Sequence, residues 1–125
     1  MASRVTMTTP ERRRTPRVEE RVPLSLTDGG MDLRTETKNL SVAGAYCALD
    51  RFIPPMTKLQ LTLELPGTFR RTRVRCTGVV VRVEPAVQDA ETMRYHTAVF
   101  FSEISDRDRA AIGRFVQRRL AVQHR

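Results

Sequence analysis

The amino-acid sequence predicts a mainly β protein: a small six-stranded antiparallel β-barrel, followed by a C-terminal α-helix and preceded by a flexible basic segment. Three observations lead to this fold class. Apolar residues alternate with polar ones in six segments, and turn-forming residues separate these segments. The C-terminal residues instead repeat their apolar positions with the spacing of a helix. A chain of 125 residues has the length of one domain with a modest core.

The expected strands follow from period-two alternation between turn signals. The clearest alternation covers residues 58–65, where leucine occupies every second position. The Asp-Gly-Gly sequence at 28–30 predicts a hairpin turn. We expect a polar turn at 39–44 and loops at 50–57 and 85–93. The six strands are expected at 18–26, 31–38, 45–49, 58–65, 70–84 and 94–101, which places the barrel at about 18–102.

Single residues refine this expectation. Pro23 indicates an edge or an irregular part of the first strand, and Gly78 indicates a bulge where a barrel strand bends. Cys47 and Cys76 lie inside apolar strand-like runs, so we expect small core residues rather than a disulfide. We expect no metal site from the two cysteines and two histidines.

The C-terminal helix is expected at about residues 105–122. Ser105 is a suitable N-cap, and acidic residues in the first turn favour the helix dipole. We expect the face with Arg107, Arg114 and Arg118 to lie in solvent, as we do for Arg71, Arg73 and Arg75 on the barrel, with a partner surface as the alternative. The apolar face that packs on the barrel consists of Ala111, Ile112, Phe115, Val116 and Leu120.

Residues 1–11 predict a disordered N-terminal tail, because they are rich in Ser, Thr and Pro and have no periodicity. Residues 12–125 then form a single domain. The start of the chain lacks the apolar region of a secretory signal. No apolar run approaches the roughly 18 residues of a membrane span, and we therefore expect a cytoplasmic protein.

The charge balance predicts an anionic ligand or partner. The formal net charge is +8, and 20 of the 22 basic residues are arginine. The strongest concentration of charge without intervening acids lies at Arg12, Arg13 and Arg17, with Arg14 between them. Arginine binds phosphate oxygens bidentately, and its plane also stacks on a base. Because Pro16 disfavours a helix before it, Arg13 and Arg17 are expected on one side of an extended segment.

A second polar element follows the second expected strand. Asn39 and Ser41 are two residues apart, so on a strand both side chains face one way. Their amide and hydroxyl groups can bond to a base edge or to a phosphate. Gly44 allows a tight turn or a close approach of ligand to backbone.

Together and in this order, these elements resemble the RxxxR and (D/N)xSxxG motifs of the PilZ domain family, whose members bind the second messenger cyclic di-GMP. The resemblance covers residues 11 to about 120 and implies a Greek-key barrel with a C-terminal helix. It implies a non-enzymatic receptor that changes its surface on binding and signals to a downstream protein partner. The ligand-binding residues that it implies are Arg12, Arg13, Arg17, Asn39, Ser41 and Gly44.

The resemblance also implies a stoichiometry. In similar proteins, an arginine directly before RxxxR goes with an intercalated ligand dimer, and Arg12 occupies that position here. We therefore expect two cyclic di-GMP molecules per chain, with no other cofactor.

Three other functions remain to be weighed. An enzyme is disfavoured, because no Ser/His/Asp, Cys/His or paired-carboxylate arrangement stands out in the sequence. A basic barrel that binds single-stranded nucleic acid is disfavoured by the absence of Trp and by the few aromatic residues left for base stacking. The third alternative is a PilZ-like module that docks on a protein without binding ligand.

Overall fold

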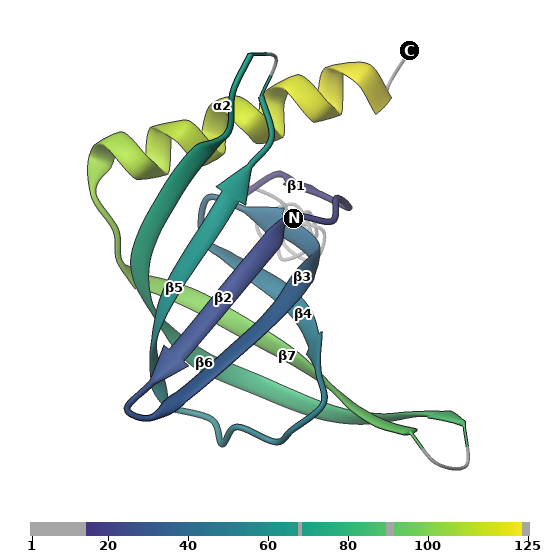
Figure 1. The fold of residues 1–125 in the computed structure, drawn as a ribbon. Helices are drawn as coiled ribbons and strands as arrows, with labels where there is room; N and C mark the ends of the chain where they lie inside the picture. Colours follow the sequence, from purple (N-terminus) through teal and green to yellow (C-terminus); the bar gives the residue numbers. More distant parts are fainter. Residues whose placement is uncertain (1–14, 68, 90–91, 124–125) are drawn as a thin grey trace, which may run out of the picture.

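The computed structural model describes residues 15–67, 69–89 and 92–123. In this part of the chain, the expected six-stranded antiparallel barrel with a C-terminal helix is confirmed (Figure 1). A further two-residue strand, β1, pairs with β3 before the barrel begins. The elements are β1 Arg17–Val18, β2 Pro23–Asp28, β3 Met31–Ser41, β4 Gly44–Leu49, β5 Lys58–Leu65, β6 Thr72–Asp89, β7 Thr92–Glu103 and α2 Asp106–Gln123.

The strand order is that of a Greek key. The sheet runs β1-β3-β2-β5-β6-β7-β4, and an additional β3–β4 pairing closes it into a barrel. Strands β2, β3 and β4 follow one another through short turns, and the connection at 50–57 then brings β5 beside β2. Three hairpin-connected strands and a fourth that returns beside the first define this topology.

The prediction of one continuous first strand at 18–26 is wrong, because the chain leaves the sheet at 19–22. Thr37 of β3 takes over the hydrogen bonds there. Its hydroxyl accepts from the Val22 amide at 3.0 Å and donates to the Glu20 carbonyl at 2.6 Å. The Thr37 amide donates to the Val22 carbonyl at 2.9 Å. Pro23 then opens β2, in agreement with the irregularity that it predicted.

The polar turn expected at 39–44 is shorter in the structure. β3 continues to Ser41 and β4 begins at Gly44, so Val42 and Ala43 alone form the turn. The reason is the pairing of β3 with its neighbours: Leu40 lies opposite Val18 of β1 and opposite Ala45 of β4. These pairs extend the ladder almost to the turn.

The prediction of a loop at 85–93 is also wrong. β6 continues to Asp89 and β7 begins at Thr92, and the two pair as a ribbon that projects beyond the barrel (Figure 1). Period-two alternation arises where one strand face is buried. Among the described side chains of this ribbon, Pro85 and Met93 are exposed and Ala86 and Arg94 are only partly buried, so no buried face imposes that period there.

The core fills the barrel and the space beneath α2, which lies across one end of it (Figure 1). Cys47 and Cys76 are free and buried, as expected. Ser105 caps α2 by accepting from the Asp108 amide at 3.0 Å. The apolar face of α2 is buried as predicted, and Arg107, Arg114 and Arg118 are exposed. The helix residues in the core are Ala111, Ile112, Phe115 and Val116, with Leu120 packed against them.

Two glycines allow strands to pack closely. The expected bulge at Gly78 is confirmed by a register shift beside it, and a Cβ there would lie 2.6 Å from Val99 Cγ1 and 2.7 Å from Leu61 Cδ1. At Gly44, a Cβ would collide with the backbone carbonyl oxygen of Val99 and lie 3.3 Å from the Phe100 Cα. Backbone atoms of a paired strand cannot rotate away, so Gly44 is the more demanding position.

We expect Gly44→Ala to lower the free energy of unfolding by about 1–3 kcal/mol, the usual cost of inserting a methyl group into a packed site. Gly30→Ala is the matched control, because a Cβ at Gly30 meets nothing within 4 Å. Urea unfolding followed by circular dichroism compares the two variants. Equal stability of both variants would contradict the close β4–β7 approach.

Candidate functional site

The structure brings the described part of the two sequence motifs together. Arg17 pairs with Ser41 in the short β1–β3 ladder. The Arg17 Nη1 donates to the Oδ1 of Asn39 at 3.2 Å, so the end of the basic element touches the start of the second element. Arg12 and Arg13 lie outside the described residues.

The Ser41 side chain is buried and holds the turn that follows it. Its Oγ accepts from the amides of Ala43 at 3.1 Å and Gly44 at 3.3 Å. The same hydroxyl lies 3.4 Å from the Gly44 carbonyl, to which it donates. With an exposed fraction of 1%, Ser41 thus has a structural task in the turn. Asn39, by contrast, is half-buried beside Arg17.

Two contacts tie the turn at Val42 and Ala43 to the rest of the barrel. The Ala43 carbonyl accepts from the Phe101 amide of β7 at 2.9 Å. The Val42 carbonyl accepts from the Arg109 Nη1 of α2 at 3.2 Å. Strand β7 and helix α2 therefore fix the turn from two directions.

Gly44 serves close packing and not a left-handed turn. Among the described glycines, Gly29 is the one with a positive φ. Gly44 instead lies opposite Phe100 and against the Val99 carbonyl of β7. Because Gly44 has no side chain, the outer surface of β4 is recessed at this point, beside Arg17.

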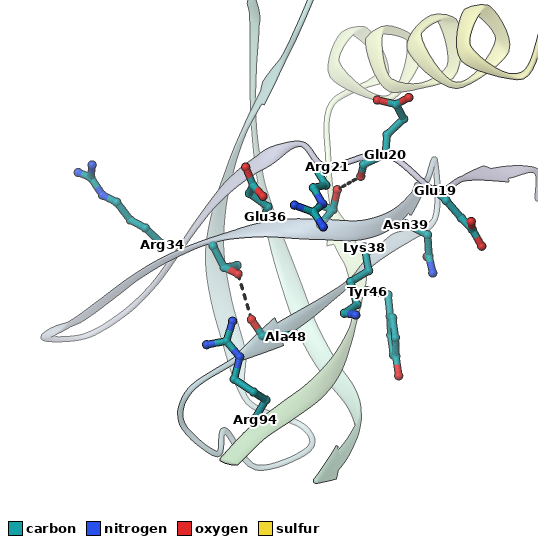
Figure 2. Close-up of a pocket in the computed structure, with 12 residues that line it drawn as sticks. Glu19, Glu20, Arg21, Arg34, Glu36, Lys38, Asn39, Tyr46, Ala48 and Arg94 are labelled. Atoms are coloured by element: carbon teal, nitrogen blue, oxygen red, sulfur yellow. Dashed lines mark hydrogen bonds between the residues drawn. The ribbon is translucent and has the colours of Figure 1, made fainter. Parts of the chain in front are cut away.

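Two surface pockets meet at this place. The larger one has a volume of about 990 Å³, and Asn39 and Tyr46 lie at one end of it (Figure 2). Its charged side chains have mixed sign: three glutamates, three arginines and one lysine line it. The mixture leaves no clear preference for an anion. The charged lining residues are Glu19, Glu20, Arg21, Arg34, Glu36, Lys38 and Arg94.

The smaller pocket, of about 330 Å³, contains Gly44 and Arg17 and lies on the outer face of β4, β7 and β6. Tyr46 lines both pockets. Arg17 and Arg82 are the charged residues of its lining, and no acidic residue is among the lining residues. Such a lining favours an anion that also carries apolar or aromatic surface. The remaining lining residues are Ala43, Ala45, Val81, Ala98, Val99 and Phe100.

Sequence reasoning missed the wall that β6 and β7 contribute. Val81 and Phe100 are about half exposed, although both lie in runs that predict core strands. The register shift between Val80 and Arg82 turns Val81 outward, and alternation places Phe100 outside between buried Val99 and Phe101. The triple valine at 79–81 after Gly78 was the available signal, because a strict alternation cannot bury three consecutive residues on one side.

The described residues contain little that suits catalysis. Burial raises the pKa of Cys47 to about 12. Burial, with a further contribution from Asp108, raises the pKa of Cys76 to about 11, so both remain thiols at neutral pH. Within 15–67, 69–89 and 92–123, no group of three His, Cys, Asp or Glu side chains could hold a metal ion. In the same residues, no helix has both the length and the apolar character to cross a bilayer.

Comparisons with known proteins identify the family to which this fold belongs. The model of the PilZ domain family matches residues 11–118. No curated protein matches the sequence significantly. The Bacillus subtilis inhibitor of motility (MotI/DgrA) superposes with a TM-score of 0.78 at 21% identity, over 90% of this chain and 53% of that chain. This chain thus spans about half the length of that protein.

Two further structures contain c-di-GMP. The PilZ domain of YcgR from Escherichia coli has a TM-score of 0.66 at 14% identity, over 90% of this chain and 94% of that chain. The Borreliella burgdorferi PlzA protein has a TM-score of 0.62 at 7% identity, over 100% of this chain and 60% of that chain. At such low identities, these superpositions show a shared fold alone.

The family match extends over most of the chain, and the barrel topology agrees with the similar structures. The chain therefore belongs to the PilZ domain family, a family of c-di-GMP receptors that are generally non-catalytic.

Proposed function

We propose that this protein is a receptor for cyclic di-GMP, which it binds through Arg12, Arg13 and Arg17 on one side and Asn39, Ser41 and Gly44 on the other. The observation that supports this most is the Arg17–Asn39 hydrogen bond of 3.2 Å, which joins the two sequence elements beside a pocket lined by arginine without acids. The c-di-GMP bound to the YcgR and PlzA structures, which share the fold, is in agreement.

The proposed roles differ from residue to residue. Arg17 already lies at the pocket, where its guanidinium can exchange the Asn39 oxygen for a phosphate oxygen. Asn39 then has its amide free for a base edge or a phosphate. Ser41 acts through the turn that its hydroxyl holds, and a direct contact of Ser41 with the ligand stays a prediction.

The receptor has no catalytic step in this proposal. It acts as an adaptor: the ligand recruits the basic N-terminal segment to the barrel, and the changed surface is read by a protein partner. The site lies next to the turn that Arg109 of α2 contacts, so a change there reaches a second element.

Calorimetric titration with cyclic di-GMP tests the receptor function. We expect Arg13→Ala and Arg17→Ala each to weaken binding about 10- to 100-fold, because each loses a charge-assisted hydrogen bond of roughly 1.5–3 kcal/mol. Arg71→Ala, an exposed arginine away from the pockets, is the matched control and should bind like the parent protein. Ser41→Ala should also weaken binding, because the variant lacks the hydroxyl that holds the turn beside the site.

Absence of binding by the parent protein would refute the receptor function and leave the protein-docking module as the better hypothesis. Unchanged affinity in both arginine variants, with a parent protein that binds, would instead refute the assignment of the site.

The same titration gives the stoichiometry. With Arg12 directly before RxxxR, we expect saturation at two cyclic di-GMP molecules per chain. Arg12→Leu removes that guanidinium and should shift saturation towards one molecule while Arg13 and Arg17 keep the site. Saturation of the parent protein at one equivalent would refute the ligand dimer.

Limited trypsin digestion tests the recruitment of the basic segment. We expect cyclic di-GMP to slow cleavage after Arg12, Arg13 and Arg14, because a bound segment cannot enter the protease. Cleavage after the exposed Arg70 and Arg71 is an internal control and should not change. Equal cleavage of the N-terminal segment at saturating ligand would argue against recruitment.

A further inference from the structure

The outer face of the barrel continues the motif residue Asn39 into a row across four strands. Asn39 of β3 lies opposite Tyr46 of β4, and Tyr46 lies opposite Ala98 of β7. Ala98 in turn lies opposite Arg82 of β6. Residues directly opposite one another in antiparallel strands share a face. With strands about 4.8 Å apart, the row runs for about 14 Å along the sheet, from Asn39 to Arg82.

A second row, two residues along β4 and β7, gives the face its shape. Gly44 lies opposite Phe100 there. The two small residues, Gly44 and Ala98, are therefore diagonal to each other, and so are the two aromatic residues, Tyr46 and Phe100. All four line the pocket of about 330 Å³, so this pocket is a slot with a low floor and an aromatic side chain at two of its corners.

The aromatic walls are suited to a planar group. The ring of Tyr46 packs edge to face on His96, with centroids 5.7 Å apart and planes inclined by 66°. This contact restricts the orientation of the Tyr46 ring. Phe100 keeps half of its surface exposed, beside the exposed Val81, and is free to be covered by a ligand.

The charges of the slot lie near its two ends. Arg17 is on the β1 side, and Arg82 is on the β6 side of the slot. Among the described residues, Arg82 has an ionic contact with Glu84, at 3.8 Å between Nε and Oε2. Both of these side chains are more than half exposed, so their attraction is weak and Arg82 can exchange it for a ligand.

We propose that this slot is a base-binding subsite outside the two motifs: one guanine of the dinucleotide stacks between Phe100 and Tyr46 above Gly44 and Ala98. The Arg82 guanidinium donates to the O6 and N7 acceptors of that guanine, a bidentate contact that suits this base. Arg17, on the other side, holds the phosphate. The inference rests on the receptor function proposed above and names the residues that complete its site.

The larger pocket is the less suitable place for this base. Its three glutamates, Glu19, Glu20 and Glu36, would face the phosphates of an anionic ligand. Tyr46 lines both pockets, and Figure 2 shows it beside Asn39 in the larger one. Because Arg17 and Tyr46 both line the smaller pocket, a ligand held by Arg17 lies directly at the acid-free slot.

Calorimetric titration of the full chain with cyclic di-GMP tests the subsite. We expect Phe100→Ala to weaken binding about 5- to 100-fold, the range found for loss of one stacked base. Phe100→Leu should lose most of this affinity and Phe100→Tyr should keep it, because the effect depends on the ring. Arg82→Ala should weaken the binding of cyclic di-GMP more than the binding of cyclic di-AMP, since adenine carries an amino group in place of O6.

The control variants are Phe69→Ala and Arg71→Ala, an exposed phenylalanine and an exposed arginine outside the slot. Both should bind like the parent protein. If Arg17→Ala loses binding while Phe100→Ala and Arg82→Ala do not, the subsite is refuted and the receptor function stands. If the parent protein does not bind cyclic di-GMP, both proposals fail.

Discussion

The short turn at Val42 and Ala43 is the constraint on which this barrel and its candidate site depend. It joins β3 to β4, whose pairing closes the sheet. The Ser41 hydroxyl holds the turn from within, the Phe101 amide holds Ala43 from β7, and Arg109 holds Val42 from α2. Because backbone groups on a barrel rim otherwise lack partners, these bonds keep the rim closed. The β1–β3 ladder that places Arg17 beside Asn39 ends at Ser41, so the barrel closure and the candidate site meet at this turn.

The fold could be predicted well wherever one strand face is buried. The leucines of β5 alternate because the barrel interior takes every second residue, and the helix pattern at Phe115 follows from packing on one end. The predictions failed where distant residues decide. Residues 19–22 leave the sheet because Thr37 satisfies their backbone, and the β6–β7 ribbon is paired although neither of its faces imposes a period. Neither effect has a local signature in the sequence.

The same distinction applies to the site. Arg17, Asn39, Ser41 and Gly44 were predicted because they are close in sequence to their own motif partners, and the structure places these four together. The place of Arg82 and Phe100 in the site could not be predicted. Their proximity to Tyr46 and Gly44 depends on the register of β4, β7 and β6 and on the bulge at Val81. The roles of Ser41 and Gly44 also needed coordinates, since a buried hydroxyl and a backbone contact are invisible in a motif.

The bond from Arg109 to the Val42 carbonyl has a thermodynamic consequence for the receptor proposed above. A protein that bound α2 and drew Arg109 away would leave a carbonyl of the turn without its donor and loosen the rim beside Asn39. Linkage is reciprocal. If such a protein weakened nucleotide binding by some factor, the nucleotide would weaken the binding of that protein by the same factor. In the receptor proposed above, this one guanidinium on a helix would thereby make release of a partner and capture of a nucleotide two sides of one equilibrium.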